Sequence, residues 1–185
     1  MNLHPSERPK DVYSSVLELV EAEREKEEAT NELAKLLKGH IKRKVIKQTV
    51  MTTVYNVTFY GAKLQILRQL EDLKEFPAGR AREASDYIAK KTFLSIRKLF
   101  YSAREIQDWF TECAYLITKI RDCALRWETP LGLPVSQPYY KRIYGTQSKM
   151  MQKPDSIKQR NAFPPNFIHS LDSSHMMLTS LFCEK

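Results

Sequence analysis

The chain has 185 residues, which is enough for one domain with a buried core or for part of a larger protein. Its 42% apolar and 28% charged residues are ordinary for a soluble globular protein, and no apolar run reaches the roughly 18 residues of a membrane helix. Three scattered cysteines argue against a disulfide framework or a zinc site, and the net charge of +8 favours a polyanionic partner.

Charge is distributed unevenly along the chain. Seven acidic and two basic residues lie within 18–32, whereas six basic and one acidic residue lie within 141–160. The N-terminus has neither an apolar signal core nor the Arg- and Ser-rich pattern of an organellar presequence. We therefore expect no targeting segment in this chain.

The first 120 residues are predicted to be helical. One long helix is expected over 11–38, ended by Gly39, and its highly charged middle predicts a solvated surface. A second helix is expected from about Ile41 and a third over 62–74. After a break at 76–79, the broad apolar face of 80–120 predicts one or two further helices.

The sequence pattern changes after Arg121. Short strands are expected on both sides of a turn at 129–132, and the polar, basic segment 139–160 predicts a mobile loop or a ragged hairpin. Pro164 and Pro165 are expected to end that segment and open a final helix. The predicted fold class is mainly α with a small β-hairpin. Its four parts are a charged leading helix (1–40), a helical region (41–120), a hairpin with a basic loop (121–160) and a final helix (161–185).

The most informative stretch runs from Arg43 to Tyr55. Arg43, Lys47 and Met51 follow one another at i, i+4 steps, so on a helix they share one face, with Tyr55 one turn further along. Residues 41–70 contain six basic side chains and no acidic one. Guanidinium and ammonium groups both bind phosphate oxygens, so this face suits a nucleotide. A solvated basic face is the alternative interpretation.

Three polar residues near the C-terminus raise the question of a metal site. His169 and Asp172 are three residues apart and share a helix face, whereas His169 and His175 point in roughly opposite directions. We therefore predict no metal site here. A Ser/His/Asp hydrolase is not predicted either, because no glycine-flanked serine turn accompanies these residues.

Three segments resemble, in the same order, motifs of the single-subunit, bacteriophage-type RNA polymerases, especially the mitochondrial branch. Residues 43–61 resemble the nucleotide-binding helix called motif B, and 127–139 resemble the hairpin between motifs B and C. Residues 163–177 resemble the helix just before motif C. The resemblance covers essentially the whole chain. It implies the fingers, with the motif B helix in 41–120, and part of the palm of a right-hand polymerase.

The resemblance also implies a role for each matching residue. Lys47 would contact the triphosphate and count as catalytic, with Arg43 as the second triphosphate contact and Met51 on the same nucleotide-binding face. Tyr55 would lie where the ribose meets the growing base pair, and His169 would reach toward the ribose 2′-hydroxyl. Nucleic-acid contacts are implied for four further residues: Asn56, Gly61, Lys141 and Arg142.

Metal chemistry is implied for the parent enzyme but not for this chain. Nucleotidyl transfer in this family needs two divalent ions, Mg2+ in the parent, held by two aspartates. One aspartate belongs upstream of residue 1 and the other downstream of residue 185. We therefore predict a DNA-directed RNA polymerase by family that does not catalyse on its own. The implied partners are DNA template, RNA transcript and ribonucleoside triphosphates, and could include transcription factors; the implied location is the mitochondrion.

Asn56 departs from the family pattern, which has glycine directly after the motif B tyrosine. Asparagine is the next-best residue in a left-handed backbone, so we expect the backbone geometry to survive while the side chain takes up extra space. The alternative to a polymerase excerpt is a non-catalytic, helical nucleic-acid-binding protein derived from a polymerase fingers region. Both interpretations predict salt-sensitive binding to nucleic acid.

Overall fold

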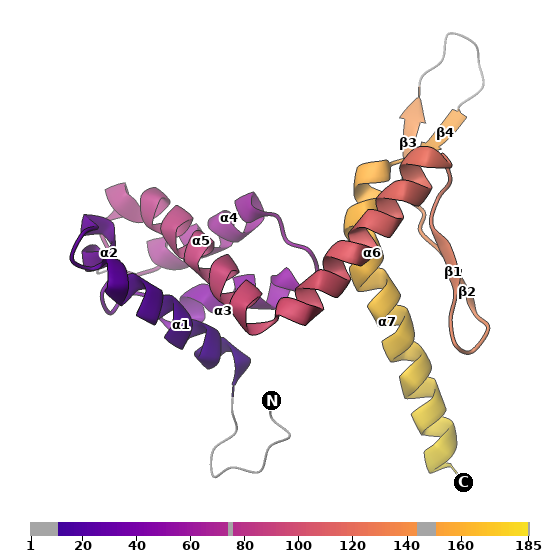
Figure 1. Cartoon of the computed structure of the whole chain (residues 1–185), viewed down its shortest axis with the longest axis horizontal. Helices are drawn as coiled ribbons and strands as arrows, with labels where there is room; N and C mark the ends of the chain where they lie inside the picture. Colours follow the sequence, from indigo (N-terminus) through magenta and orange to yellow (C-terminus); the bar gives the residue numbers. More distant parts are fainter. Residues whose placement is uncertain (1–10, 74–75, 144–150, 185) are drawn as a thin grey trace. The chain divides into compact units, whose positions relative to one another are not determined.

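The computed structural model describes residues 11–73, 76–143 and 151–184. The chain folds as two compact units, residues 1–101 and 102–185 (Figure 1). In its described residues, the first unit contains only helices and turns, whereas the second combines two helices with two antiparallel hairpins. Across the described ranges, no helix is both long enough and apolar enough to span a membrane.

The leading segment forms two helices, α1 (Val12–Glu27) and α2 (Glu32–Leu36), so the prediction of one long helix was wrong. The chain turns after α1, and the side chain of Asn31 then accepts a hydrogen bond of 2.9 Å from the amide of Leu33. An asparagine that captures an amide two residues ahead starts a new helix at that point.

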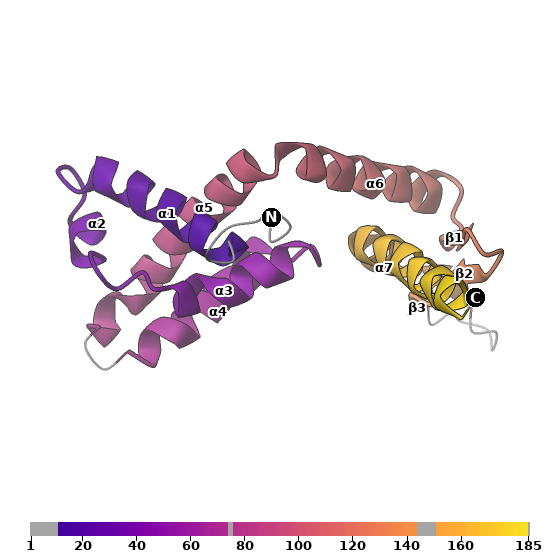
Figure 2. The same cartoon turned by 90° about the horizontal axis from the view of Figure 1, so that it is seen from below.

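The core of the first unit is aliphatic and lies among four helices. α3 (Arg43–Thr53) and α5 (Ala81–Leu99) pack against α1, and α4 (Phe59–Glu71) packs against α3 and α5 (Figures 1 and 2). A short 3-10 turn, η1 (Ala78–Arg80), leads into α5. Each helix contributes apolar residues spaced three or four apart, which places them on one side. The fully buried members include Val16, Val20, Ile46, Ile66, Leu70 and Ile88.

The acidic surface of α1 is tied to α5 by ion pairs. The carboxylate of Glu23 lies 2.8 Å from Nζ of Lys98, and Glu27 pairs with Lys91 and accepts a 2.8 Å hydrogen bond from the hydroxyl of Tyr87. Hydrogen bonds from Lys98 and then Lys26 lower the pKa of Glu23 to about 2. The prediction of a simply solvated helix missed these contacts, because the partner lysines are more than 60 residues away.

The second unit contains two antiparallel hairpins. The helix α6 (Tyr101–Ile120) leads to β1 (Arg126–Glu128) and β2 (Pro134–Ser136), in which Trp127 lies opposite Val135. β3 (Tyr140–Ile143) and β4 (Met151–Pro154) form the other hairpin. The predicted strands around the turn at 129–132 are confirmed. The fold is mainly helical, as predicted, and the second hairpin agrees with the ragged hairpin that was one of the two expectations for 139–160, although the predicted fold class named only one hairpin.

The final helix, α7 (Ser156–Cys183), starts before the two prolines that were expected to open it. Asp155 caps its first turn by accepting a hydrogen bond of 3.2 Å from the amide of Lys158. The helix then continues through Pro164 and Pro165, although each proline removes one backbone donor. Aromatic packing on both sides offsets this loss, with ring-centroid distances of 5.4 Å for Trp127–Phe163 and 5.0 Å for Phe110–Phe167.

A buried amide network joins the hairpins to α7. The side chain of Gln159 donates to the carbonyl oxygens of Gln137 at 3.0 Å and Tyr139 at 3.1 Å, and accepts from the amide of Leu125 at 3.3 Å. It also accepts a 2.7 Å hydrogen bond from Nε2 of Gln137, whose own Oε1 accepts from Asn166 at 2.9 Å. Each buried polar atom of this network is therefore satisfied by another element of the same unit.

Candidate functional site

The basic face predicted from the sequence is present on α3. Val45, Ile46, Thr49 and Val50 are buried, and the exposed side chains of the same helix include Arg43, Lys47 and Met51. This division follows from the helical period of 3.6 residues, because positions 43, 47 and 51 drift only slowly around the axis. The structure therefore confirms that these three residues share an exposed helix face.

The first turn of α3 attracts anions. Arg43 begins the helix, both of its sequence neighbours are lysines, and no acidic residue lies in the first turn. The amide dipoles add partial positive charge at the same end. Asp11 supplies an anion here: its Oδ2 lies 2.5 Å from Nε of Arg43. This hydrogen bond holds the pKa of the Asp11 carboxyl below its usual range.

Tyr13 contacts both cations of this face from the first turn of α1. Its ring centroid lies 4.9 Å from Cζ of Arg43 and 6.0 Å from Nζ of Lys47. Cations are attracted to the electron-rich face of an aromatic ring, so the ring favours the presence of both charged groups at one place. The sequence interpretation missed Asp11 and Tyr13, because no local spacing connects residues that are about 30 positions apart.

Tyr55 lies in the turn after α3, since the helix ends at Thr53; the expectation that the helix reaches Tyr55 was wrong. Asn56 has φ +58°, its amide donates to the carbonyl of Thr53 at 3.0 Å, and the amide of Val57 donates to that of Thr52 at 3.2 Å. These two hydrogen bonds form a Schellman motif, which ends the helix. The expected left-handed geometry of Asn56 is confirmed.

Gly61 lies in the first turn of α4, where its amide donates to Oγ1 of Thr58 at 3.1 Å. A Cβ at this position would approach Cγ2 of Val57 to 3.2 Å and Oγ1 of Thr58 to 3.3 Å. The glycine thus lets the turn after Asn56 lie close against α4. This is a local reason for glycine here, in addition to the nucleic-acid contact predicted for it.

The remaining predicted residues belong to the second unit. His169 is exposed on α7, with Nδ1 3.8 Å from Oδ2 of Asp172, and Lys141 on β3 has its Nζ 3.6 Å from Oδ1 of Asp155. Arg142 is the next residue of β3. Over the ranges that the structure describes, no three His, Cys, Asp or Glu side chains gather as a metal site. Lys141 and Arg142 are cations and His169 offers an imidazole, so these three residues do not supply the carboxylates that a Mg2+ pair needs.

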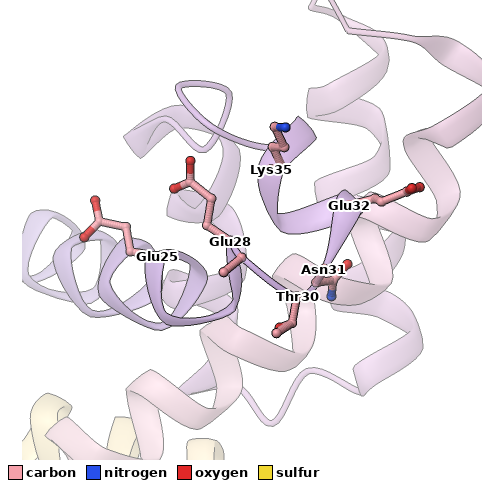
Figure 3. Close-up of a pocket in the computed structure, with 7 residues that line it drawn as sticks. Glu25, Glu28, Thr30, Asn31, Glu32 and Lys35 are labelled. Atoms are coloured by element: carbon pink, nitrogen blue, oxygen red, sulfur yellow. The ribbon is translucent and has the colours of Figure 1, made fainter.

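A surface pocket of about 570 Å³ lies at the turn between α1 and α2 (Figure 3). Its charged lining consists of Glu25, Glu28, Glu32 and Lys35. Three carboxylates against one ammonium group repel an anionic ligand. The pocket is thus not a second candidate for a nucleotide, and the cation face of α3 remains the candidate site of the first unit.

A comparison with known protein families identifies the family of this chain. Residues 1–185, the whole chain, match the sequence model of DNA-dependent RNA polymerase. The chain belongs to this polymerase family. The resemblance inferred from the three motifs is thereby confirmed, and the cation face of α3 belongs to a member of this family.

Individual polymerases agree with this assignment. The chain is 47% identical to the mitochondrial DNA-directed RNA polymerases of Mus musculus and Homo sapiens, over 99% of its own length and 16% of each relative. It is 42% identical to the chloroplastic/mitochondrial DNA-directed RNA polymerase 2 of Arabidopsis thaliana, over 100% of its own length and 20% of the relative. The chain thus spans a fifth or less of these relatives.

Proposed function

We propose that this chain is the nucleotide-holding part of a DNA-directed RNA polymerase, comprising the fingers and part of the palm. The observation that carries the proposal is the pair Arg43 and Lys47, exposed together on α3 at a helix start that favours anions. Membership of the polymerase family supplies the anion that fits, a ribonucleoside triphosphate.

Arg43 and Lys47 would bind the triphosphate in different ways. The guanidinium offers a planar set of donors, and the ammonium is a compact charge on a flexible stem that follows the phosphate as it moves. In the reaction the 3′-hydroxyl of the RNA gives up its proton to solvent, and its oxygen attacks the α-phosphorus. The bond between that phosphorus and the oxygen bridging to the β-phosphorus breaks, and pyrophosphate leaves. The two cations stabilise the negative charge on the leaving pyrophosphate, which is the role proposed for Lys47 as a catalytic residue.

The other predicted residues would select the sugar and hold the nucleic acid. Tyr55 and Met51 are exposed next to the cations along α3 and the following turn, and would contact the nucleoside. His169 would contact the ribose 2′-hydroxyl. Template and transcript would contact a set that includes Asn56, Gly61, Lys141 and Arg142. In a complete polymerase, we expect Tyr55→Phe to relax the choice between ribose and deoxyribose, because it removes a hydroxyl near the sugar.

The cellular setting follows from the relatives. The polymerases of Mus musculus and Homo sapiens are named as mitochondrial, so we place this chain in mitochondrial transcription, where transcription factors are further candidate partners. We expect the 185-residue chain alone to bind nucleotide without polymerising it, because two-metal catalysis needs carboxylate ligands that would have to come from the rest of such an enzyme. Primer extension by the purified chain with Mg2+ would contradict this expectation.

Nucleotide binding tests the proposal directly. Isothermal titration of the 185-residue chain with ATP, in the absence of divalent metal, should show affinity that falls about tenfold in Arg43→Gln and in Lys47→Gln, since each removes a charge-assisted hydrogen bond. Arg68→Gln is the matched control: it removes the same charge from an exposed position in the last turn of α4, away from the first turn of α3, and should change the affinity less than twofold.

The alternative function gives a different result in the same titrations. A non-catalytic nucleic-acid-binding protein is favoured only by the net charge of +8. It would bind single-stranded RNA or DNA in a salt-dependent manner. Its ATP affinity, however, would be equally insensitive to substitution at Arg43, Lys47 and Arg68. That outcome would refute the nucleotide-holding function.

A further inference from the structure

The cation face of α3 already holds an anion from within the chain. The Asp11 carboxylate contacts Nε of Arg43, and the pair is partly open to solvent, with 29% of the Asp11 side chain and 46% of the Arg43 side chain exposed. Exposed ion pairs contribute little to stability, so a solute anion can replace one partner at small cost. The Asp11 carboxylate therefore occupies the position beside Arg43 where a ligand phosphate would bind.

Asp11 is held at this place by its own helix. Its Oδ1 accepts a hydrogen bond of 2.9 Å from the amide of Tyr13, and its Oδ2 accepts one of 3.2 Å from the hydroxyl of Ser14. The Tyr13 ring lies against both cations from the same turn. The carboxylate thus stays near Arg43 whether or not the ion pair is formed, because the helix cap holds it there.

We propose that Asp11 is an internal competitor of the polyphosphate for Arg43. The proposal rests on the nucleotide-holding function above and adds a residue that tunes it. A triphosphate carries several charges and can reach both Arg43 and Lys47, whereas the carboxylate carries one charge and contacts Arg43. The ligand therefore wins the exchange, and Asp11 takes Arg43 back when pyrophosphate leaves. Asp11 weakens binding and favours product release through the same contact.

The charge of Asp11 sets the size of the expected effect. Its repulsion of a bound anion grows with the charge of that anion, so removing it should help a long phosphate chain more than a single phosphate. The difference should also shrink at high salt, because the groups are partly exposed. A purely structural role of Asp11 would show neither dependence.

The test uses the full 185-residue chain with inorganic tripolyphosphate and orthophosphate as probes. Asp11→Asn removes the charge and keeps a good helix cap, and Asp11→Ser is a second uncharged cap. Isothermal titration should show tripolyphosphate binding three- to tenfold tighter in both variants, with a smaller gain for orthophosphate. In an Arg43→Gln background, Asp11→Asn should change the affinity less than twofold, because the competition acts through Arg43.

Asp86→Asn is the matched control for charge. Asp86 lies on α5 of the same unit, is similarly exposed at 30%, and pairs with Lys63 and Lys90. Its neutralisation should change tripolyphosphate affinity less than twofold. Two results would overturn the inference if tripolyphosphate binding still depended on Arg43 and Lys47. One is equal tightening by Asp86→Asn, and the other is unchanged or weaker binding in both Asp11 variants. If tripolyphosphate binding did not depend on those two cations, the proposed function itself would fail, and this inference with it.

Discussion

The two units are stabilised by different kinds of contact. The first has a largely aliphatic core among four helices and a surface of ion pairs, in which hydrogen bonds from basic partners lower the pKa values of Asp11, Glu23, Glu27, Glu28 and Asp86. The second is held by clustered aromatic rings and a buried amide network. Loss of apolar volume or of carboxylate charge should thus affect the first unit, and loss of a hydrogen-bonding group the second.

The sequence offers a probe that separates the two units. Both tryptophans, Trp109 and Trp127, belong to residues 102–185. Tryptophan fluorescence therefore reports on the second unit, whereas far-ultraviolet circular dichroism reports on helices of both. Urea unfolding followed by both signals distinguishes the two units, and equal shifts in both signals would show that the units unfold as one.

The largest effect is expected from a cavity in the first unit. Ile46 is fully buried on the inner side of α3, so Ile46→Ala should lower the free energy of unfolding by about 2 to 5 kcal/mol. The dichroism midpoint should fall while the fluorescence midpoint stays in place. Val54 lies just after the helix and is 64% exposed, so Val54→Ala should change the free energy of unfolding by less than about 0.5 kcal/mol. Equal losses at the two positions would contradict the assignment of the core.

A comparable but smaller loss is expected in the second unit from Gln159→Leu. The substitution leaves the buried amide of Leu125 and the carbonyl oxygen of Gln137 without their side-chain partner, which should destabilise the unit by about 2 to 3 kcal/mol. Here the fluorescence midpoint should fall first. Gln48→Leu, the same change at an exposed position of α3, should leave that midpoint unchanged.

A third effect concerns the turn that ends α3. Asn56 has a positive φ, which β-branched residues adopt poorly, so Asn56→Val should lower the stability of the first unit by about 1 to 2 kcal/mol. Asn56→Gly should be neutral or slightly stabilising, because glycine has no Cβ to strain. A valine variant as stable as the glycine variant would contradict the left-handed geometry. Both are measured by the dichroism midpoint.

The smallest effect per group is expected from acid. The folded-state pKa of Glu23 is about 2, below the ordinary value of 4.5, so its ion pairs stabilise fully above pH 4.5 and are lost as the pH falls toward 2. Between pH 6 and 3 the dichroism midpoint should fall more than the fluorescence midpoint. Glu23→Gln should reduce this difference, whereas Glu71→Gln, an exposed position on α4, should not. An equal fall of both midpoints would contradict the view that carboxylate charge stabilises the first unit more than the second.

Local patterns predicted much of the fold, and long-range contacts were not predictable. The i, i+4 spacing of Arg43, Lys47 and Met51 gave a helix face that the structure confirms, and the turn at 129–132 gave the first hairpin. The contact between Asp11 and Arg43 depends on how α1 packs on α3, which one sequence does not reveal. The prolines of α7 led to a wrong prediction of where the helix starts. The aromatic packing that offsets their lost hydrogen bonds comes from residues far along the chain. Asn31, in contrast, was a readable capping signal that the single-helix prediction overlooked.

The prolines inside α7 have one more consequence. In a regular helix the amides at positions 164 and 165 would bond the carbonyl oxygens of residues 160 and 161, and proline has no amide hydrogen to offer. Two rungs of the helical ladder are thus missing in succession. The turn before them is tied to the hairpins by Gln159, and the turns after them carry His169. Trp127 of β1 donates a 2.9 Å hydrogen bond to Oγ of Ser170, so side chains tie the turn after the prolines to the first hairpin as well. Hydrogen exchange should therefore show α7 protected on both sides of the prolines as far as the buried Ser174, and less protected in the exposed turns from 175 to 183.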